Sequence, residues 1–485
     1  MGIGGTPAVK RTAGVFCSLD AVQKISYHKI SDIFGGILMS ENKMGSMPEG
    51  KLLLTLSLPV MASMLISALY NIVDSMFVAR ISDDALNAVS LCFPVQLLMI
   101  SAATGIGVGL NVLLSRALGA KQQQRANAVA MHGVFLSLIC WALFAALGAA
   151  FSRPFLALFT DNPAILSMGT DYLRICTAFS CGVFLLFTAE RLMQATGKTV
   201  YHMVIQCIGA LINVVLDPIL IFGLFGCPAL GVAGAAAATV IGQCIAMVIG
   251  FYLNLKLNRD IHLSAKGFRP NAAITAEICR VGLPAALMQG LSTVMTAGMN
   301  AILMPLNSAA VGFFGVYYKL QNFLFMPLYG LTNTMVPIIG YNLGAKLPER
   351  VRGVLRSALA FSTVIMLAGA VLFFAFPEAL LRLFGDEAFA FSGGIHAIRI
   401  IAPSFLAAGI VTAFAGALQG LGRSCDALLL TALRQLIILL PAAFLLGQHS
   451  IHTLWFAFPI AELGALPFSI ILWRRAARLS QMPSQ

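Results

Sequence analysis

The sequence Leu-Gly-Ala-Lys occupies residues 118–121 and is followed by Arg125, and the same residues return at 343–346, followed by Arg350. The offset that carries residue 118 to residue 343 recurs without a gap elsewhere in the chain: Leu58 and Pro59 with Leu283 and Pro284, Gln96 with Gln321, Phe159 and Asp161 with Phe384 and Asp386, Arg174 and Ile175 with Arg399 and Ile400, and Gln194 and Gly197 with Gln419 and Gly422. Internal symmetry of this kind is typical of folds built from two copies of one unit. We therefore expect two halves with the same fold.

The composition places both halves in a membrane. Apolar residues make up 59% of the 485-residue chain and charged residues 10%, whereas soluble globular domains carry about 25% charged residues. Apolar runs such as residues 136–150 and 364–376 are continuous, and they lack the alternation that marks the strands of a transmembrane barrel. The sequence predicts a membrane protein made of helices.

Twelve apolar segments are long enough to cross a bilayer as helices. They lie at about residues 53–79, 86–114, 127–150, 165–189, 200–225, 231–256, 277–303, 311–338, 353–376, 394–418, 427–447 and 453–473. Because each half holds an even number of spans, the halves share one orientation and are related by an axis along the membrane normal. We predict an all-α membrane protein with 12 transmembrane helices in two six-helix lobes. The N-lobe is expected at 51–256, a cytoplasmic linker at 257–275 and the C-lobe at 276–475.

Basic residues collect in alternate loops. The loops after even-numbered segments and the C-terminal tail hold 17 Lys and Arg, against three in the other loops. Since Lys and Arg are enriched on the cytoplasmic side, both termini of a multi-pass protein of the cell membrane, the inner or plasma membrane, are predicted to be cytoplasmic. Residues 1–50 are predicted to be a disordered tail and residues 476–485 a second tail. We expect the functional chain to begin near Met39, Met44 or Met47.

The sequence lacks the motifs of enzymes and ATP-driven pumps. It contains no HExxH, GxSxG or Walker A sequence, the motifs of metalloproteases, hydrolases and nucleotide-binding proteins. The net charge of +12 is explained by the loop asymmetry rather than by nucleic-acid binding. The ten Cys form no CxxC pair, so no metal or disulfide framework is implied. We expect no enzyme and no cofactor, and an ion gradient as the source of energy.

Two of the carboxylates inside apolar segments share a helical face with other polar residues. Asp74 follows Tyr70 and Asn71 by four and three residues and shares their helical face. Asp217 follows Asn213 by four residues and shares its face. A charge at the bilayer centre costs at least about 2.5 kcal/mol, so each carboxylate needs a partner, water or a proton. If the two meet, like charge and burial favour a proton on one of them, and the pair would act as an ion switch.

Pro218 directly follows Asp217. Because proline has no N–H, the carbonyl of Val214 loses its helical partner, and the residue before a proline is disfavoured in helical geometry. We therefore expect a bent segment in which Asp217 leaves the helix beside a free carbonyl oxygen. Two structural alternatives stay open. Asp74 would then be a hydrated residue at the outer interface, capped against Arg80, and Asp217 a hydrogen-bonding group between helices.

The repeat duplicates the scaffold but not these polar residues. The positions that the repeat pairs with Asp74, Asn213 and Asp217 hold Met299, Ile438 and Ala442. This asymmetry is expected if one lobe holds an ion site and the other shapes a cavity. It is not expected if the aspartates merely support the shared fold.

Other polar residues of the membrane segments favour structural roles. Glu190 and Arg191 are expected to form a local salt bridge at the cytoplasmic end of the fourth segment. Lys319 and Arg434 either line the cleft or pair with Glu462, and the sequence leaves both interpretations open. The isolated histidines are expected to be structural: His132, His202 and His396.

These motifs resemble the multidrug and toxic compound extrusion (MATE) family over residues 47–475. The resemblance rests on Leu-Pro at the start of segments 1 and 7, Tyr-Asn-Ile-Val-Asp-Ser-Met-Phe-Val at 70–78, the repeated Leu-Gly-Ala-Lys, Asn-x-x-x-Asp-Pro at 213–218 and Gly-Val-Ala-Gly-Ala-Ala at 231–236. It implies that Asp74, Asn213 and Asp217 form the cation site of the N-lobe, with Thr239 as a looser candidate for its hydroxyl. Tyr70 and Pro59 match cavity-side positions. Segments 7 and 10 carry no clear embedded carboxylate, which departs from the branch with acidic residues in the C-lobe.

The resemblance implies a multidrug efflux antiporter that exports organic cations in exchange for H⁺ or Na⁺. A bound Na⁺ would lie at Asp74, Asn213 and Asp217. The residues expected at the substrate cavity are Tyr70, Ser67, Asn71, Gln206 and Met288. The expected partners are small organic substrates and membrane lipid, without nucleic acid, and the protein is expected to be a monomer. A flippase of lipid-linked precursors or polysaccharides on a related scaffold is the alternative, and a non-transporting receptor is a third.

Overall fold

The computed structural model describes residues 43–264, 266–384 and 392–480. Residues 44–485 form one compact unit, and its described residues form helices and no strand. An all-α fold is expected in a lipid bilayer, because a helix satisfies its backbone N–H and C=O groups internally where lipid offers no hydrogen-bond partner. The predicted N-terminal tail lies outside the described residues as far as residue 42, as do residues 481–485 of the second tail.

The first half of the repeat forms six spans. Its helices are α2 (Glu49–Ala79), α3 (Asp83–Gly119), α4 (Gln123–Leu156), α5 (Pro163–Ala178), α6 (Cys181–Ala195), α7 (Thr199–Phe222) and α8 (Val232–Leu257). α5 and α6 meet at a bend of 44° and together make one broken span. Several helices extend past the apolar segments of the sequence, because polar residues continue a helix beyond the hydrocarbon.

The second half repeats this pattern with more interruptions. Its elements are α9 (Ala272–Leu303), α10 (Ser308–Gly344), α11 (Pro348–Ala375), α12 (Pro377–Arg382), α13 (Gly394–Ile401), η4 (Ala402–Ser404), α14 (Phe405–Gly420), α15 (Ser424–Ala432), η5 (Leu433–Ile438), α16 (Leu439–Gly447), α17 (Ile451–Leu454) and α18 (Ala457–Ser480). Over the described ranges the chain has 11 helical stretches able to cross a membrane, or 12 when the bent pair α5 and α6 counts as one. The twelve predicted segments are confirmed.

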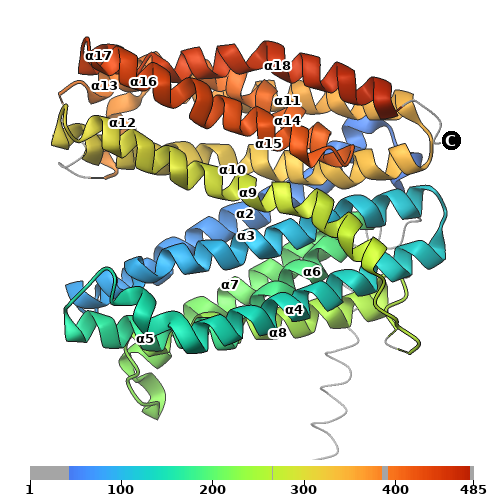
Figure 1. The fold of residues 1–485 in the computed structure, drawn as a ribbon, viewed down its shortest axis with the longest axis horizontal. Coiled ribbons are helices and arrows are strands. Elements are labelled where there is room, and N and C mark those ends of the chain that lie inside the picture. Colours follow the sequence, from blue (N-terminus) through green and yellow to red (C-terminus); the bar gives the residue numbers. More distant parts are fainter. Residues whose placement is uncertain (1–42, 265, 385–391, 481–485) are drawn as a thin grey trace, which may run out of the picture. The chain divides into compact units, whose positions relative to one another are not determined.

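The two halves occupy separate regions of the unit. Figure 1 shows α4 to α8 in its lower part and α10 to α18 in its upper part. Between them α3 packs against α9, and α2 packs against α10. The pairing joins the first two spans of one lobe to the first two of the other. This is the two-lobed arrangement that the repeat predicts.

The repeated Leu-Gly-Ala-Lys sequence marks the point where the lobes meet. Gly119 ends α3 and Gly344 ends α10. A Cβ atom on Gly119 would overlap the backbone carbonyl of Tyr341, and a Cβ atom on Gly344 would overlap the carbonyl of Arg116. The repeat maps each contact onto the other, so the symmetry axis of the repeat passes between them. Glycine is needed there because the two backbones touch.

Helices α3 and α10 end with the same backbone geometry at the two Leu-Gly-Ala-Lys sequences. Lys121 and Lys346 adopt left-handed backbone conformations with φ of 57° and 58°. The N–H of Gln122 donates to Ala117 O, and the N–H of Leu347 donates to Asn342 O, both at 2.9 Å. These bonds satisfy carbonyl groups left open at a helix end. The Leu-Gly-Ala-Lys motif therefore ends a helix and also provides the glycine that contacts the other lobe.

Further contacts between the lobes lie on the same helices. A Cβ atom on Gly105 of α3 would approach Gly282 O of α9 to 2.8 Å, and a Cβ atom on Gly330 of α10 would approach the Cα atom of Met61 of α2 to 2.8 Å. Gly105 and Gly330 are again equivalent positions of the repeat. The lobes thus touch through a symmetric seam of glycines.

One expectation about α7 is wrong. The helix runs unbroken from Thr199 to Phe222 with Pro218 inside it, so Asp217 keeps helical geometry. The physical reason is that packing against α2 and α8 holds the helix together, since proline is tolerated in a membrane helix where neighbouring helices compensate for the lost backbone bond. The helix ends four residues after Pro218 at Phe222, and the next residue, Gly223, has a φ of 75°.

Candidate ion-coupling site

The structure brings the two membrane carboxylates together between α2 and α7. The side chain of Asp74 lies within hydrogen-bonding reach of Asp217. Asp217 is fully buried, Asp74 is partly buried, and the Asp74 Oδ1 atom is buried without a hydrogen-bond partner. A buried carboxylate oxygen without a partner costs free energy. The arrangement is therefore poised to accept a proton or a cation.

Asn213 and Thr239 complete this group. The carboxamide of Asn213 lies 3.3 Å from an Asp217 carboxylate oxygen and 3.2 Å from the Thr239 hydroxyl of α8. α7 and α8 pack against each other, so three helices contribute to one site. All four residues predicted for ion coupling are neighbours.

The donor set fits two kinds of ion. Two carboxyl groups, a carboxamide and a hydroxyl offer oxygen atoms, which suit Na⁺ and other hard cations. Two carboxyl groups that meet in a poorly solvated place can also bind a proton, because like charges there do not both stay ionised. Within the described ranges no group of three or more His, Cys, Asp or Glu could hold a metal ion.

The predicted cavity residues divide into two groups. The Gln206 amide donates to the Ser67 hydroxyl at 3.0 Å, and the Asn71 amide donates to the Ser67 carbonyl at 2.7 Å. Tyr70 interacts with both Ser67 and Asn71. These four lie one to two turns from Asp74 along α2 and α7. Met288 does not join them, because it lies on α9, where its sulfur contacts the Gln419 amide at 3.4 Å.

Glu190, Arg191 and His202 have other partners than the sequence predicts. Arg191 donates to Gln194 at 2.8 Å, while Glu190 faces His202 at 3.6 Å. The expected Glu190–Arg191 salt bridge is therefore wrong, since consecutive helical residues point to different faces. His202 was expected to be isolated and is not. Its spacing of four residues from Gln206 is the sequence signal that could have placed it on the polar face of α7.

In the C-lobe, Arg434 pairs with Glu462 of α18 at 3.4 Å and also contacts the Thr412 hydroxyl at 3.3 Å. Arg434 belongs to η5, a π-helical turn between α15 and α16. The sequence left open whether this arginine lines the cleft or pairs with Glu462, and the ion pair is the observed arrangement. Inserted π-helical turns are frequent at functional sites.

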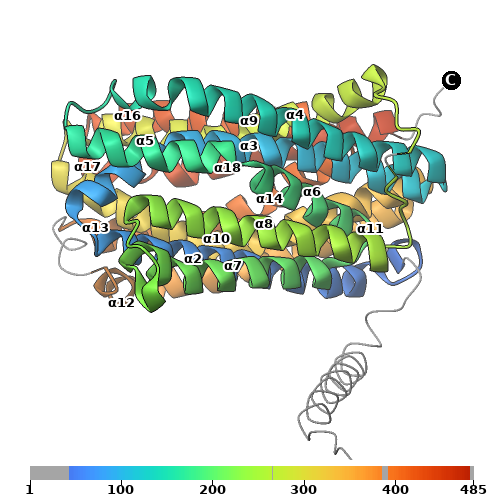
Figure 2. The same ribbon diagram turned by 90° about the horizontal axis from the view of Figure 1, so that it is seen from below.

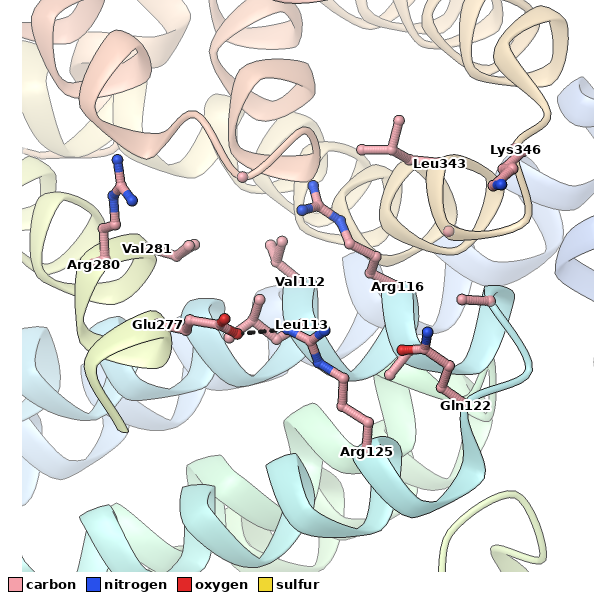
Figure 3. A pocket seen from close by; sticks show the side chains of 14 residues that line it. Val112, Leu113, Arg116, Gln122, Arg125, Glu277, Arg280, Val281, Leu343 and Lys346 are labelled. Atoms are coloured by element: carbon pink, nitrogen blue, oxygen red, sulfur yellow. Dashed lines mark hydrogen bonds and ion pairs between the residues drawn. The ribbon is translucent and has the colours of Figure 1, made fainter. Parts of the chain in front are cut away.

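A pocket of about 420 Å³ opens where the lobes meet, and none of the predicted site residues lines it. Figure 3 shows Arg116, Arg125 and Arg280 around it, with Glu277 in an ion pair with Arg125. That ion pair spans 2.8 Å and joins α4 to α9. Arg116 also donates to Leu421 O of the other lobe at 2.9 Å. The pocket belongs to the seam between the lobes rather than to the acid pair.

A two-lobed bundle of membrane helices built from an internal repeat is an architecture of secondary transporters. The MatE family model matches residues 59–219 and again residues 284–445. The chain belongs to this family, the multidrug and toxic compound extrusion family of efflux transporters. The two matches begin at Pro59 and Pro284, which are equivalent positions of the internal repeat.

Relatives with different names share most of the chain. An FAD transporter of Shewanella oneidensis is 29% identical over 420 residues, covering 86% of this chain and 93% of the relative. The multidrug export protein MepA of Staphylococcus haemolyticus is 28% identical and covers 82% of this chain and 87% of the relative. A solved structure of a multidrug resistance MATE family transporter of the MOP superfamily in its outward-facing conformation superposes with a TM-score of 0.85 at 23% identity. It covers 91% of this chain and 99% of that one, which shows a common fold.

Proposed function

We propose that this efflux transporter is an antiporter that exports organic cations in exchange for H⁺ or Na⁺. The coupling ion binds at Asp74, Asn213, Asp217 and Thr239. The observation that supports this most is the pair of carboxyl groups inside the N-lobe, one fully buried and the other with an oxygen that has no partner. Binding of the ion and binding of the substrate are linked because their residues share α2 and α7.

The substrate cavity includes Ser67, Tyr70, Asn71 and Gln206. An ion entering the acid pair reduces its negative charge and so weakens the attraction for an organic cation bound one or two turns away. By thermodynamic reciprocity, a bound substrate lowers the affinity for the ion by the same factor. This is the differential affinity that an antiporter requires.

The helix that carries Asp74 also touches the opposite lobe. Met61 of α2 packs closely against Gly330 of α10. A shift of α2 on ion binding therefore changes the contact between the lobes at the glycine seam. We propose alternating access by movement of the lobes about this seam, in a monomer of the cell membrane with both termini in the cytoplasm.

The test is efflux from proteoliposomes. Purified protein is reconstituted, a fluorescent organic cation is loaded, and a pH or Na⁺ gradient is imposed. Asp74→Asn and Asp217→Asn are expected to reduce gradient-driven efflux at least about tenfold, the effect of a lost interaction of roughly 1.4 kcal/mol. Asp171→Asn, which changes an exposed Asp of α5 in the same lobe, is the matched control. Full gradient-driven efflux in both acid-pair variants would refute the proposal.

A second candidate substrate is an anionic dinucleotide. The relative described as an FAD transporter suggests it, and the exposed Lys319 on α10 supplies a membrane-segment cation that would attract such a molecule. The same vesicles loaded with FAD separate the two candidates. Export of FAD that depends on Lys319 would replace the organic cation as the substrate class.

A further inference from the structure

A polar ladder joins α2 to α7 below the acid pair. His202 Nε2 lies 3.2 Å from Ser63 Oγ, and Gln206 Nε2 lies 3.0 Å from Ser67 Oγ. Both pairs are 139 residues apart in sequence, so the helices run parallel in one register. Figure 2 shows α2 and α7 side by side. In the same register Asp74 is level with Asn213, and the ladder leads from the acid pair toward the N-terminal end of α7.

The hydrogen bonds of Ser63 fix the proton of the histidine. The Ser63 hydroxyl donates its single proton to Val60 O at 2.8 Å. It therefore accepts from His202, and Nε2 of the imidazole carries the hydrogen. In a neutral imidazole the other nitrogen, Nδ1, is then an acceptor.

That second nitrogen faces a carboxylate. His202 Nδ1 lies 3.6 Å from Glu190 Oε2. His202 is 7% exposed and Glu190 6%, and both Nδ1 and the Glu190 Oε1 atom are buried without a hydrogen-bond partner. Two acceptors facing each other in a dry site repel. One added proton, on either atom, turns the repulsion into a hydrogen bond.

The neighbouring cation does not take the place of this added proton. Arg191 of α6 is the cation that interacts with both Glu190 and His202, but its guanidinium donates to Gln194. On α2, Tyr70 interacts with both Asp74 and Glu190. The charges of both groups therefore act on the Tyr70 hydroxyl.

We propose that Glu190 and His202 share a transferable proton and form a second proton-binding site of the N-lobe, linked to Asp74 and Asp217 through the packed helices α2 and α7. The inference rests on the proposed antiport function and specifies H⁺ as its ion. The stretch of α7 from His202 to Asp217 is about 22 Å long at a rise of about 1.5 Å per residue. The two sites therefore bind protons at opposite ends of one helix.

The second site lies at the end of α7 that the loop charges predict to be cytoplasmic. Lys198, four residues before His202, is bound to Asp260 at 2.6 Å and to Asn258 at 3.1 Å. A proton released from the Glu190–His202 pair passes to water beyond this end of the helix. Substrate binding at the cavity would then expel protons from both sites.

The test measures proton release. Substrate is added to detergent-solubilised protein in weak buffer with a pH indicator, and ΔpH-driven efflux is followed in proteoliposomes. In Glu190→Gln the amide N–H₂ donates to His202 Nδ1, so the variant imitates the protonated pair and stays folded. We expect about one proton fewer released per bound substrate, because one linked site is lost, and ΔpH-driven efflux reduced about tenfold. Glu190→Asp should restore proton release, since it keeps a titratable group.

The controls separate this inference from the proposed function. Ser137→Ala removes a buried hydrogen bond between α4 and Thr188 of α6 without touching the ladder, and wild-type proton release is expected. Wild-type proton release and pH profile in both Glu190→Gln and His202→Gln would overturn the second site. Efflux driven by Na⁺ alone, without proton release and lost in Asp217→Asn, would overturn the second site but keep the antiporter. Efflux retained in Asp217→Asn would refute the antiporter itself.

Discussion

The glycine contact between the lobes gives the sharpest prediction. In Gly119→Ala the new methyl group overlaps the backbone carbonyl of Tyr341, and a backbone atom cannot move aside as a flexible side chain can. Overpacking of this kind costs about 1–3 kcal/mol. The cost applies only while the lobes touch at this end, so the equilibrium moves toward their separation by about 5- to 150-fold. Gly344→Ala should do the same, because it forms the symmetric contact.

The assay is a distance measured between the lobes. Spin labels at the exposed positions Gln124 and Glu349 report the separation by pulsed electron resonance, and efflux is measured on the same variants. We expect longer distances and slower efflux in Gly119→Ala. Gly315→Ala is the matched control, since it lies on α10 with nothing within 4 Å of the new methyl group. An unchanged distance distribution together with wild-type efflux in Gly119→Ala would show that the seam does not restrict the lobes.

Two ion pairs are expected to behave differently from each other. Arg434→Gln leaves Glu462 as an unpaired charge in the C-lobe, where the Arg434 and Glu462 side chains are 12% and 14% exposed, and should destabilise the fold by about 3–5 kcal/mol. The double variant with Glu462→Gln should recover much of that loss in thermal unfolding, and an equal loss in single and double variants would contradict the pairing. Arg125→Ala breaks an ion pair whose side chains are 50% and 45% exposed, so its effect on thermal stability should stay below about 1 kcal/mol and shrink with salt. A larger effect that is insensitive to salt would mean that the pair with Glu277 is better shielded from water than its exposure indicates.

Hydropathy was sufficient for the helices because lipid leaves the backbone no alternative. The twelve segments, their pairing into halves and the symmetry between α3 and α10 could all be predicted from residue spacing. The exact ends of the helices could not be predicted, since polar residues extend a helix without leaving a hydropathy signal. The effect of Pro218 was predicted wrongly, because the local preference of the preceding residue yielded to the packing of α7 between α2 and α8.

The sequence by itself determined which polar residues share a helical face. Asp74 with Tyr70 and Asn71, and Asp217 with Asn213, follow from the helical period alone. It also determined that the acids are confined to one lobe, since the second copy of the repeat lacks them.

The tertiary structure decided which of these faces meet. Contacts between helices depend on register and rotation, which arise from side-chain packing summed over many residues and leave no local signature. The register between α2 and α7 brings Asp74 to Asp217 and His202 to Ser63. The approach of α6 adds Glu190 to His202, so the Glu190–His202 pair became visible only when three helices were placed together.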